Sequence, residues 1–217
     1  MVNISFRPLN QSLNRTIIMI KKKQTFFLIF KRIFDILFSL FMIMVCFLFV
    51  WWWIFIINLI VTKGYPFFNP ERLGKNKKVF KMFKFRTMRK DAPIIPPYEM
   101  TNEQRISFET RFGRFLRKTS LDETLQFFNV LMGQMSIVGP RPGAKDNEEM
   151  LVKARESFSP NAFDVKPGIT GYSQVYMKRQ HDVMSKAWFD SEYVKKMSFL
   201  IDLKIIIHTF LFIFKGK

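Results

Sequence analysis

The 217-residue sequence contains one cysteine, Cys46, and two histidines, His181 and His208. A single cysteine excludes an intramolecular disulfide, and its place inside an apolar run indicates packing rather than chemistry. So few Cys and His side chains also argue against a zinc site built from these ligands. The sequence has neither a P-loop signature nor a G-x-S-x-G nucleophile elbow. These absences direct the search away from disulfide-stapled domains, zinc proteins, P-loop enzymes and α/β-type serine hydrolases.

Acidic residues are also few, because 17 Asp and Glu stand against 35 Lys and Arg, for a formal net charge of +18. Yet 48% of the residues are hydrophobic and 27 are Phe, a composition that a disordered basic tail lacks, so we expect a folded protein. Two kinds of partner fit this charge: nucleic acid, or an anionic membrane together with phosphate-bearing substrates. The apolar run described next favours membrane lipid, and no nucleic-acid partner is expected.

Residues 33–61 form an almost continuous apolar run that is interrupted by Asp35, Ser39 and Asn58. As a helix the run would measure roughly 43 Å, more than the ~30 Å hydrocarbon core of a bilayer requires, and it is too long for a cleaved signal peptide. The basic flanks are Lys21, Lys22, Lys23, Lys31 and Arg32 before the run and Lys63, Arg72, Lys75, Lys77 and Lys78 after it. Because positive flanks normally stay in the cytoplasm, these matched clusters predict a re-entrant hairpin that enters and leaves the membrane by one face.

The alternative for this run is a single tilted span whose orientation is set by the bulky C-terminal part. Residues 51–53 are three consecutive tryptophans, and Trp prefers the membrane interface. A straight helix that starts at Ile33 would bring them to the opposite interface, and this detail favours a crossing.

A β-hairpin is predicted after the apolar run. Residues 74–78 have the composition of a hairpin loop, and residues 79–88 have that of a strand. The alternation of side chains along this strand places Lys84 and Arg86 on one face. Two cations on one face would clamp a diphosphate, although a solvated strand face fits the same spacing.

Two helical segments of mixed character follow. Phe108, Phe112 and Phe115 have helical spacing among several arginines, which is typical of an interfacial helix under an anionic bilayer and equally of a helix that buries one stripe in a core. Residues 199–214 are apolar but contain Asp202 and Lys204. These charges favour a membrane-surface helix over a second crossing.

The segment from Arg117 to Glu123 contains the strongest signal for chemistry. Ser120 followed three residues later by Glu123 matches a capping box, which predicts a helix from this point to Gly133. Asp122 would then lie in the first turn, where the helix dipole and Arg117 favour its ionised form. An ionised carboxylate beside a cation suits a nucleophile on phosphorus or a Mg²⁺ ligand. The alternatives are that Glu123 only caps the helix and that Asp122 only complements its dipole.

Two further turns have features of anion sites. Residues 139–142, Gly-Pro-Arg-Pro, hold Arg141 between prolines, which lowers the entropy lost when the side chain binds phosphate. Residues 166–171, Lys-Pro-Gly-Ile-Thr-Gly, combine a cation with a tight turn that has free backbone amides.

In this order, the segments between residues 31 and 204 resemble the bacterial sugar transferase family, the monotopic phosphoglycosyl transferases. The matching motifs are Lys-Arg-Ile-Phe-Asp at 31–35, Glu-Arg-Leu-Gly at 71–74, Lys-Phe-Arg-Thr-Met at 84–88, Thr-Ser-Leu-Asp-Glu at 119–123, Val-Gly-Pro-Arg-Pro at 138–142 and Lys-Pro-Gly-Ile-Thr-Gly at 166–171. Several such motifs together are far more specific than any one of them.

The resemblance implies a transferase that moves a sugar-1-phosphate from a UDP-sugar to undecaprenyl phosphate in two steps. Asp122 would attack the sugar-bearing phosphate and expel UMP, and undecaprenyl phosphate would take the sugar phosphate from the acyl-phosphate. Glu123 would complete the dyad and help Asp122 to hold Mg²⁺. Such a reaction is the first membrane step of polysaccharide synthesis, for a capsule, an exopolysaccharide or a glycoprotein, and the resemblance leaves the sugar open.

Further residues and the fold class follow from the same resemblance. Arg117 matches the phosphate-anchoring arginine of the family, and phosphate contacts are expected for Lys84, Arg86 and Arg141 from charge and motif position. The expected fold is α+β and monotopic, with a re-entrant N-terminal helix hairpin, surface amphipathic helices and a small β-hairpin.

The resemblance also predicts the domain organisation and the location of the chain. We expect a basic extension over residues 1–30, a re-entrant membrane helix over 31–62 and a catalytic domain with membrane-surface helices over 63–217. The catalytic domain would face the cytoplasm at the bacterial inner membrane. With no large domain before the membrane segment, a minimal form of the enzyme is expected.

The sequence departs from the family pattern at two places. The membrane helix of the family is usually broken by a Ser-Pro pair, and no proline occurs near Phe47 and Leu48, which removes the usual cause of the break. Thr124 and Leu125 stand where Leu-Pro is common, a change expected to alter helix packing only. Two rival functions remain: an inactive membrane scaffold, and a membrane-tethered basic protein that binds anionic lipid or nucleic acid.

Overall fold

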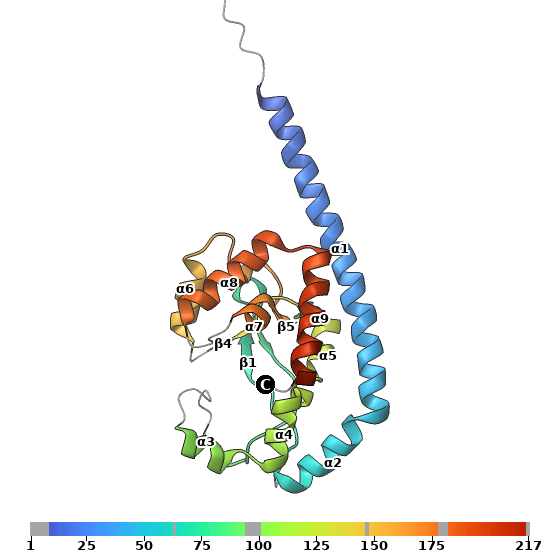
Figure 1. Cartoon of the computed structure of the whole chain (residues 1–217), viewed down its shortest axis with the longest axis vertical. Helices are drawn as coiled ribbons and strands as arrows, with labels where there is room; N and C mark the ends of the chain where they lie inside the picture. Colours follow the sequence, from blue (N-terminus) through green and yellow to red (C-terminus); the bar gives the residue numbers. More distant parts are fainter. Residues whose placement is uncertain (1–8, 63, 94–100, 146–147, 178–181, 216–217) are drawn as a thin grey trace, which may run out of the picture.

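The computed structural model describes residues 9–62, 64–93, 101–145, 148–177 and 182–215 (Figure 1). Its α-helices are α1 (Leu9–Phe49), α2 (Trp51–Val61), α3 (Asn102–Phe108), α4 (Arg111–Thr119), α5 (Gln126–Leu131), α6 (Glu149–Glu156), α7 (Tyr172–Tyr176), α8 (Val183–Lys196) and α9 (Phe199–Lys215). Its strands are β1 (Glu71–Leu73), β2 (Val79–Lys81), β3 (Ser136–Val138), β4 (Gly143–Ala144) and β5 (Gly168–Thr170), and its 3₁₀ turns are η1 (Lys75–Lys77), η2 (Leu121–Glu123) and η3 (Ala162–Asp164). This mixture of helix and strand confirms the predicted α+β class.

The long helix α1 passes along one side of the folded part, and α2 leaves its end in a new direction (Figure 1). The change occurs at Val50, whose φ and ψ of −122° and −51° are not helical. Two hydrogen bonds span the break, from the Val50 amide to the Cys46 carbonyl at 2.9 Å and from the Ile54 amide to the Val50 carbonyl at 3.2 Å. A break in the apolar run is therefore present without a proline. Helix α1 also continues through the predicted boundary between residues 30 and 31.

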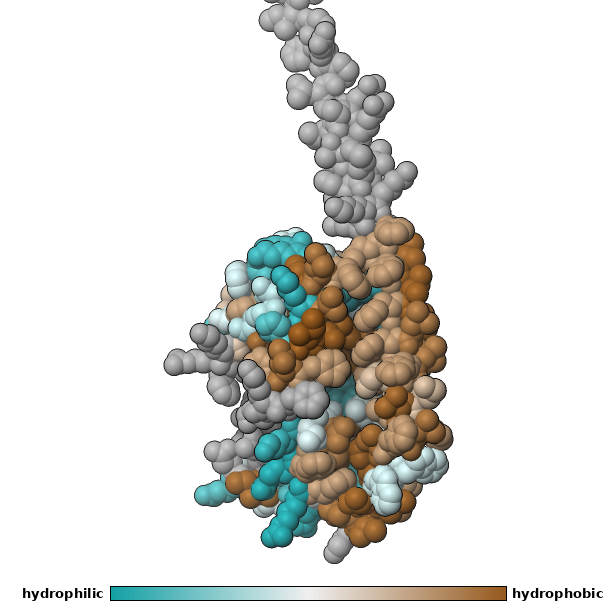
Figure 2. Space-filling model, turned by 45° about the vertical axis from the view of Figure 1, so that its right-hand side comes forward, coloured by the Kyte–Doolittle hydropathy of each residue, from teal (hydrophilic) through white to brown (hydrophobic). Residues whose placement is uncertain are grey.

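Part of α1 has the character of a membrane segment. Among the described residues, Thr25–Phe49 is the one helical stretch that is long and apolar enough to cross a bilayer by length and composition, and only 17% of its apolar 18-residue window is buried inside the protein. A core helix would be mostly buried, so packing within the chain does not explain this composition. Figure 2 shows hydrophobic side chains covering the face along this helix, with hydrophilic side chains gathered on the other side of the molecule.

The predicted β-hairpin is confirmed, but its second strand is shorter than expected. Strands β1 and β2 pair antiparallel across the turn at η1, and β4 joins the other edge of β1. The sequence predicted a strand to residue 88, whereas β2 ends at Lys81. Beyond this point the chain remains extended but changes partners: the Phe68 amide donates to the Lys84 carbonyl at 2.9 Å, and the Phe85 amide donates to the Asp122 carbonyl at 3.0 Å. The alternating partners explain why no continuous ladder forms.

The helix predicted around Phe108–Arg117 is split into α3 and α4. Thr110 begins α4, because its side-chain oxygen accepts a hydrogen bond from the Gly113 amide at 2.8 Å. Gly113 is buried, and a Cβ there would lie 1.9 Å from the Thr87 carbonyl oxygen. One face of α4 therefore packs in the interior, while Phe115 on the other face is exposed. The C-terminal helix predicted at 199–214 is confirmed as α9.

The motif at residues 31–35 fastens α1 to the rest of the fold. Arg32 donates to the carbonyls of Val130 and Leu131 at 2.6 and 2.8 Å and so satisfies the C-terminal end of α5. The buried Asp35 carboxylate accepts a hydrogen bond from the Ile137 amide of β3 at 3.0 Å. These contacts hold α1 in register with the centre of the domain.

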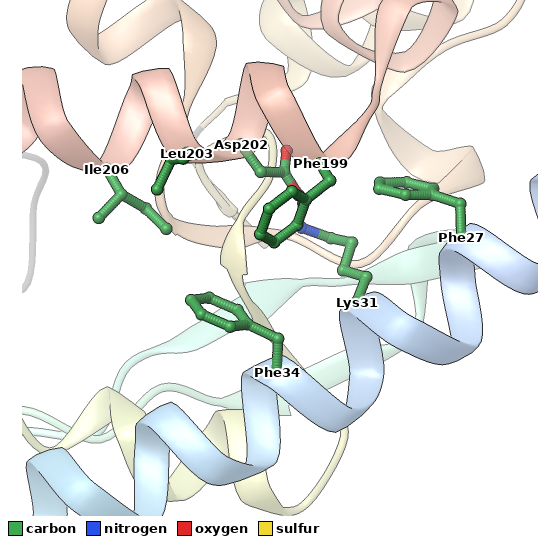
Figure 3. Close-up of a pocket in the computed structure, with 7 residues that line it drawn as sticks. All are labelled: Phe27, Lys31, Phe34, Phe199, Asp202, Leu203 and Ile206. Atoms are coloured by element: carbon green, nitrogen blue, oxygen red, sulfur yellow. The ribbon is translucent and has the colours of Figure 1, made fainter.

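Helix α9 lies against α1 across a shallow groove (Figure 3). The groove is lined by Phe27, Lys31, Phe34, Phe199, Asp202, Leu203 and Ile206. The Lys31 ammonium pairs with Asp202 at 2.5 Å, and the Phe30 and Phe199 rings meet edge to face at 5.3 Å. The Tyr193 hydroxyl of α8 also donates to Asp202, at 2.8 Å. A charged contact inside apolar walls thus joins α1, α8 and α9.

Candidate active site at the Asp122–Glu123 turn

The Asp122–Glu123 pair lies in η2, between α4 and α5, and the local structure differs from the prediction. Ser120 is the left-handed C-cap of α4, with φ of 57°, and its side chain caps no helix. The capping-box interpretation of Ser120 and Glu123 is therefore wrong, because α4 extends to Thr119 and the chain must reverse at the next residue. Helix α5 begins only at Gln126, and the predicted stop is confirmed by Gly133, which has φ of 77° just after the helix.

Asp122 is buried, with 5% of its surface exposed. Burial, followed by the negative charge of Glu123, raises the pKa of its carboxyl from 3.8 to about 6, although Lys84 and Arg117 oppose the shift. Arg117 favours the ionised form of Asp122, as predicted, but the net shift of the pKa is in the opposite direction, because the loss of hydration outweighs the neighbouring cations. At neutral pH the group is still mostly ionised, and it is more basic than an exposed aspartate. Such a carboxylate is a better nucleophile than one fully satisfied by its partners.

Glu123 is held by Arg141, which comes from the predicted Gly-Pro-Arg-Pro turn. The Arg141 guanidinium donates to both carboxylate oxygens of Glu123, at 2.6 and 3.4 Å. This two-pronged contact fixes the orientation of both side chains. The structure thus brings two candidate residues 18 positions apart together and pairs Arg141 with the dyad itself, while its phosphate contact stays a prediction.

Lys84 and Arg86 lie on the same side of their segment, as predicted. The Lys84 ammonium and the Arg86 guanidinium lie 5.4 and 5.9 Å from the centre of the Phe68 ring. Burial lowers the pKa of Lys84 from 10.5 to about 8, while the charges of Glu123 and Asp122 act against this change. Lys84 therefore faces the dyad. Arg86 is held by a backbone contact instead, because its Nε donates to the Tyr65 carbonyl at 2.9 Å.

Arg117, at the end of α4, is positioned by two residues that the sequence did not single out. Its Nε donates to the Thr87 hydroxyl at 2.9 Å, and its Nη1 pairs with Glu109 at 3.2 Å. Its positive charge lowers the pKa of Asp122. Thr87 belongs to the segment that contains Lys84 and Arg86. The alternation of side chains along that segment could have indicated that Thr87 points into the protein. No local pattern points to Glu109.

The turns at residues 139–142 and 166–171 pack against each other. Strands β3 and β5 pair in parallel, and the Gly139 amide donates to the Thr170 carbonyl while the Gly168 amide donates to the Pro140 carbonyl, both at 2.9 Å. A Cβ on Gly168 would lie 2.1 Å from the Gly139 nitrogen, so only glycine allows this approach. The Gly168 amide belongs to the turn whose amides were predicted to be free for an anion, but it is bonded to the Pro140 carbonyl instead. Burial lowers the pKa of Lys166, and the charges that act on it include those of Arg32 and Asp35 but not those of the dyad.

The fold and the site together define an α+β protein that carries a buried aspartate next to a partly buried glutamate among basic side chains, beside a long apolar helix. The model of the family described as bacterial sugar transferase matches residues 26–216. The chain therefore belongs to the bacterial sugar transferase family, as its motifs predicted.

Individual relatives have names that agree with this assignment. The chain is 39% identical over 155 residues to the UDP-glucose:undecaprenyl-phosphate glucose-1-phosphate transferase of Xanthomonas campestris pv. campestris, covering 68% of this chain and 31% of the relative. It is 34% identical over 196 residues to the galactosyl transferase CpsE of Streptococcus agalactiae serotype III, covering 84% and 41%. It is 33% identical over 198 residues to the undecaprenyl-phosphate galactose phosphotransferase of Salmonella typhimurium, covering 82% and 39%. The chain thus spans 31–41% of the length of these relatives.

Proposed function

We propose that this chain transfers a sugar-1-phosphate from a UDP-sugar to undecaprenyl phosphate, with Asp122 as the nucleophile. The observation that carries the proposal is a buried aspartate whose pKa is raised to about 6, influenced by the cations of Lys84, Arg117 and Arg141. The names of the relatives, which specify glucose and galactose transfer to undecaprenyl phosphate, support the substrates.

In the first step the Asp122 carboxylate attacks the sugar-bearing phosphorus of the UDP-sugar. A bond forms between Asp122 Oδ and phosphorus, and the bond from phosphorus to the bridging oxygen breaks, so that UMP leaves with the electron pair. In the second step an oxygen of undecaprenyl phosphate attacks the same phosphorus and displaces the Asp122 carboxylate. Both nucleophiles are already anions, so neither step requires a general base. The two steps let a water-soluble donor and a lipid acceptor use one site in turn.

The cations around the dyad would supply the electrostatic part of the catalysis. Lys84 and Arg117 both oppose the negative charge at Asp122, and the same charges would stabilise the phosphoryl oxygens during transfer. Arg141 would act at one remove, because it holds Glu123 in a fixed orientation. Arg86 would contact the second phosphate from its place beside Phe68.

The dyad also has a donor set that fits Mg²⁺. The charge of Glu123 raises the pKa of Asp122, a repulsion that a divalent cation held by these residues would relieve. Among the described residues no cluster of three or more metal-ligating side chains exists, which agrees with an ion held by one or two carboxylates and by substrate phosphates. Asp122 and Glu123 would hold the ion, which would neutralise charge on the diphosphate. Arg141 donates to both oxygens of Glu123, so an ion held by Glu123 would compete with that pair and is expected to loosen it.

We further propose that α1 and α2 form the re-entrant membrane hairpin, with the dyad at the cytoplasmic face of the inner membrane. The observation behind this is the change of direction at Val50, in the middle of the exposed apolar surface. In a Cys46→Ser background, Ser12→Cys and Lys75→Cys should both be protected from an impermeant maleimide in intact cells and labelled after lysis. Labelling of one of them from outside would demonstrate a crossing instead.

The central test is UMP release from a panel of UDP-sugars that includes UDP-glucose and UDP-galactose, with undecaprenyl phosphate and Mg²⁺. Wild type should release UMP, and Asp122→Asn should be at least about a thousandfold slower. Without the acceptor, wild type should give a burst of about one UMP per protein, which is the signature of a covalent intermediate. Asp182→Asn is the matched control, since Asp182 caps α8 at an exposed position where Asn caps equally well.

Each outcome of this test has a defined meaning. Equal release by wild type and Asp122→Asn would retain the transferase and reject the nucleophile. No release by well-folded wild type in lipid, with any donor, would reject the enzyme and favour the scaffold function.

A further inference from the structure

A hydrogen bond joins the start of α2 to the residue that follows the dyad. The Trp51 indole Nε1 donates to the Thr124 hydroxyl oxygen at 3.0 Å. Trp51 is 9% exposed, whereas its neighbours Trp52 and Trp53 are 55% and 69% exposed. One of three consecutive tryptophans is therefore turned inward, and the break at Val50 is the backbone feature that precedes it.

The Thr124 hydroxyl relays this contact into the dyad turn. It donates to the Leu121 carbonyl at 2.8 Å, and the Thr124 amide reaches the same carbonyl at 3.3 Å. Leu121 and Thr124 bracket Asp122 and Glu123, so the hydroxyl closes the 3₁₀ turn that presents both carboxylates. The indole N–H occupies one of the two acceptor positions of that hydroxyl and fixes its orientation.

A second contact from α2 reaches the segment that is hydrogen-bonded to Asp122. The Asn58 Nδ2 donates to the Pro66 and Arg86 carbonyls at 2.9 and 2.8 Å, and Asn58 is fully buried. The segment it holds adjoins the turn directly, because the Phe85 amide donates to the Asp122 carbonyl at 3.0 Å. The chain thus forms a closed circuit from Trp51 through the turn to residues 85 and 86 and back to Asn58.

Helix α2 has its other face outside the domain. Its exposed residues are Trp52, Trp53, Phe55, Ile56, Ile57, Leu59, Ile60 and Val61. If α1 and α2 form the proposed re-entrant membrane hairpin, α2 would contact lipid on one side and the dyad turn on the other. A change in how α2 docks would therefore move Thr124 directly.

We propose that Trp51 is a positioning residue for the transfer reaction, because its indole N–H holds the Asp122–Glu123 turn in the geometry for attack. This inference rests on the proposed function. It assigns catalytic importance to a side chain in the apolar run that touches neither substrate nor the reacting atoms. A displaced nucleophile would slow the chemical step while leaving the cations that bind the donor in place.

The test measures kcat and the donor KM for UMP release by the full chain in lipid nanodiscs. Trp51→Phe keeps the ring and removes the donor, and Thr124→Val keeps the shape and removes the hydroxyl. Each should lower kcat about tenfold, the equivalent of one hydrogen bond of about 1.4 kcal/mol, with KM changed less than about twofold. The double variant should be no more than about twofold slower than Thr124→Val, since both single variants remove the Trp51–Thr124 bond and Thr124→Val also removes the bond to the Leu121 carbonyl.

Two further variants separate positioning from general damage. Thr124→Ser restores a hydroxyl and should recover kcat to within about threefold of wild type. Trp53→Phe makes the same substitution on an exposed tryptophan and should leave kcat unchanged.

The inference is overturned by unchanged kcat in Trp51→Phe or in Thr124→Val, by an equal loss in Trp53→Phe, or by multiplicative losses in the double variant. Any of these outcomes, when the wild type is active, refutes the positioning role of Trp51 and leaves the proposed function intact. A wild type that releases no UMP from any donor refutes the proposed function, and the positioning role with it.

Discussion

Asp190 and Asp122 are both buried, with 1% and 5% of their surface exposed, but their surroundings differ. Asp190 in α8 accepts hydrogen bonds from Arg155 Nε at 3.0 Å and Nη2 at 2.5 Å, and from the Ser173 hydroxyl at 2.9 Å. Asp122 has burial and the charge of Glu123 as its largest influences, which raise its pKa to about 6. One buried carboxylate is compensated by its partners, and the other is left with a raised free energy when it is ionised.

The difference agrees with a structural role for Asp190 and with the reactive role proposed for Asp122. The Arg155–Asp190 pair joins α6 to α8, and Arg155 Nη2 also donates to the Arg141 carbonyl at 2.9 Å, so the pair supports the backbone of the site. A carboxylate that is fully satisfied by donors gains little from binding substrate. The Asp122 carboxylate, by contrast, would lose its negative charge on forming the bond to phosphorus, which relieves the repulsion by Glu123. Perturbed groups of this kind gather at functional sites.

The largest expected effect is the loss of the compensated pair. Arg155→Leu would leave Asp190 buried without its main partner, and should lower the free energy of unfolding by about 3–5 kcal/mol. Urea unfolding in detergent micelles measures this. Lys153→Met, in the same helix, removes an exposed partner of Glu149 and should cause no measurable change. A loss below about 1 kcal/mol in Arg155→Leu would contradict the distinction between the two aspartates.

Substitution of the uncompensated aspartate, Asp122, should stabilise the fold. Because the pKa of Asp122 is higher in the folded protein than in the unfolded chain, ionisation of this carboxyl destabilises the fold increasingly as pH rises from about 4 through 6. Asp122→Asn removes this term, so at pH 8 it should be more stable than wild type by up to about 3 kcal/mol. The gain should shrink as pH falls towards 4. A variant less stable than wild type at pH 8 would indicate that Asp122 is compensated in the manner of Asp190.

The contrast between the two aspartates also marks what a sequence can predict. The β-hairpin with its loop at 74–78 and the helix at 199–214 follow from local composition, and both were predicted. The direction of the pKa shift at Asp122 was not, because it depends on burial by segments distant in the chain. The Ser120 capping box failed because a local pattern cannot register that α4 extends through Thr119.

The remaining contacts of the site are long-range and have no periodic signature. Trp51 reaches Thr124 across 73 positions, and Arg32 reaches Val130 across 98. In a run of apolar residues, nothing distinguishes Trp51 from the two tryptophans that follow it. Arg32, counted as a flanking charge of a membrane segment, satisfies the end of α5 instead. Basic residues beside an apolar helix can therefore dock that helix as well as orient it.

The smallest expected effect concerns the pH dependence of the first step. The rate of the UMP burst should rise as pH passes about 6, when Asp122 ionises, and decline above about 8, when Lys84 loses its proton. The acceptor is omitted because a phosphate monoester itself titrates near pH 6. Lys84→Met removes a cation that lowers the pKa of Asp122, so it should move the acid limb up by about one pH unit and abolish the decline.

Glu123→Gln should move the same limb down, because the charge of Glu123 raises the pKa of Asp122. Lys118→Met, at an exposed position one residue beyond Arg117, should leave both limbs in place. An acid limb near pH 4 in wild type would place Asp122 with the compensated aspartates. A limb near 6 that moves in opposite directions in Lys84→Met and Glu123→Gln would assign the titration to Asp122, since those two charges act on it with opposite sign.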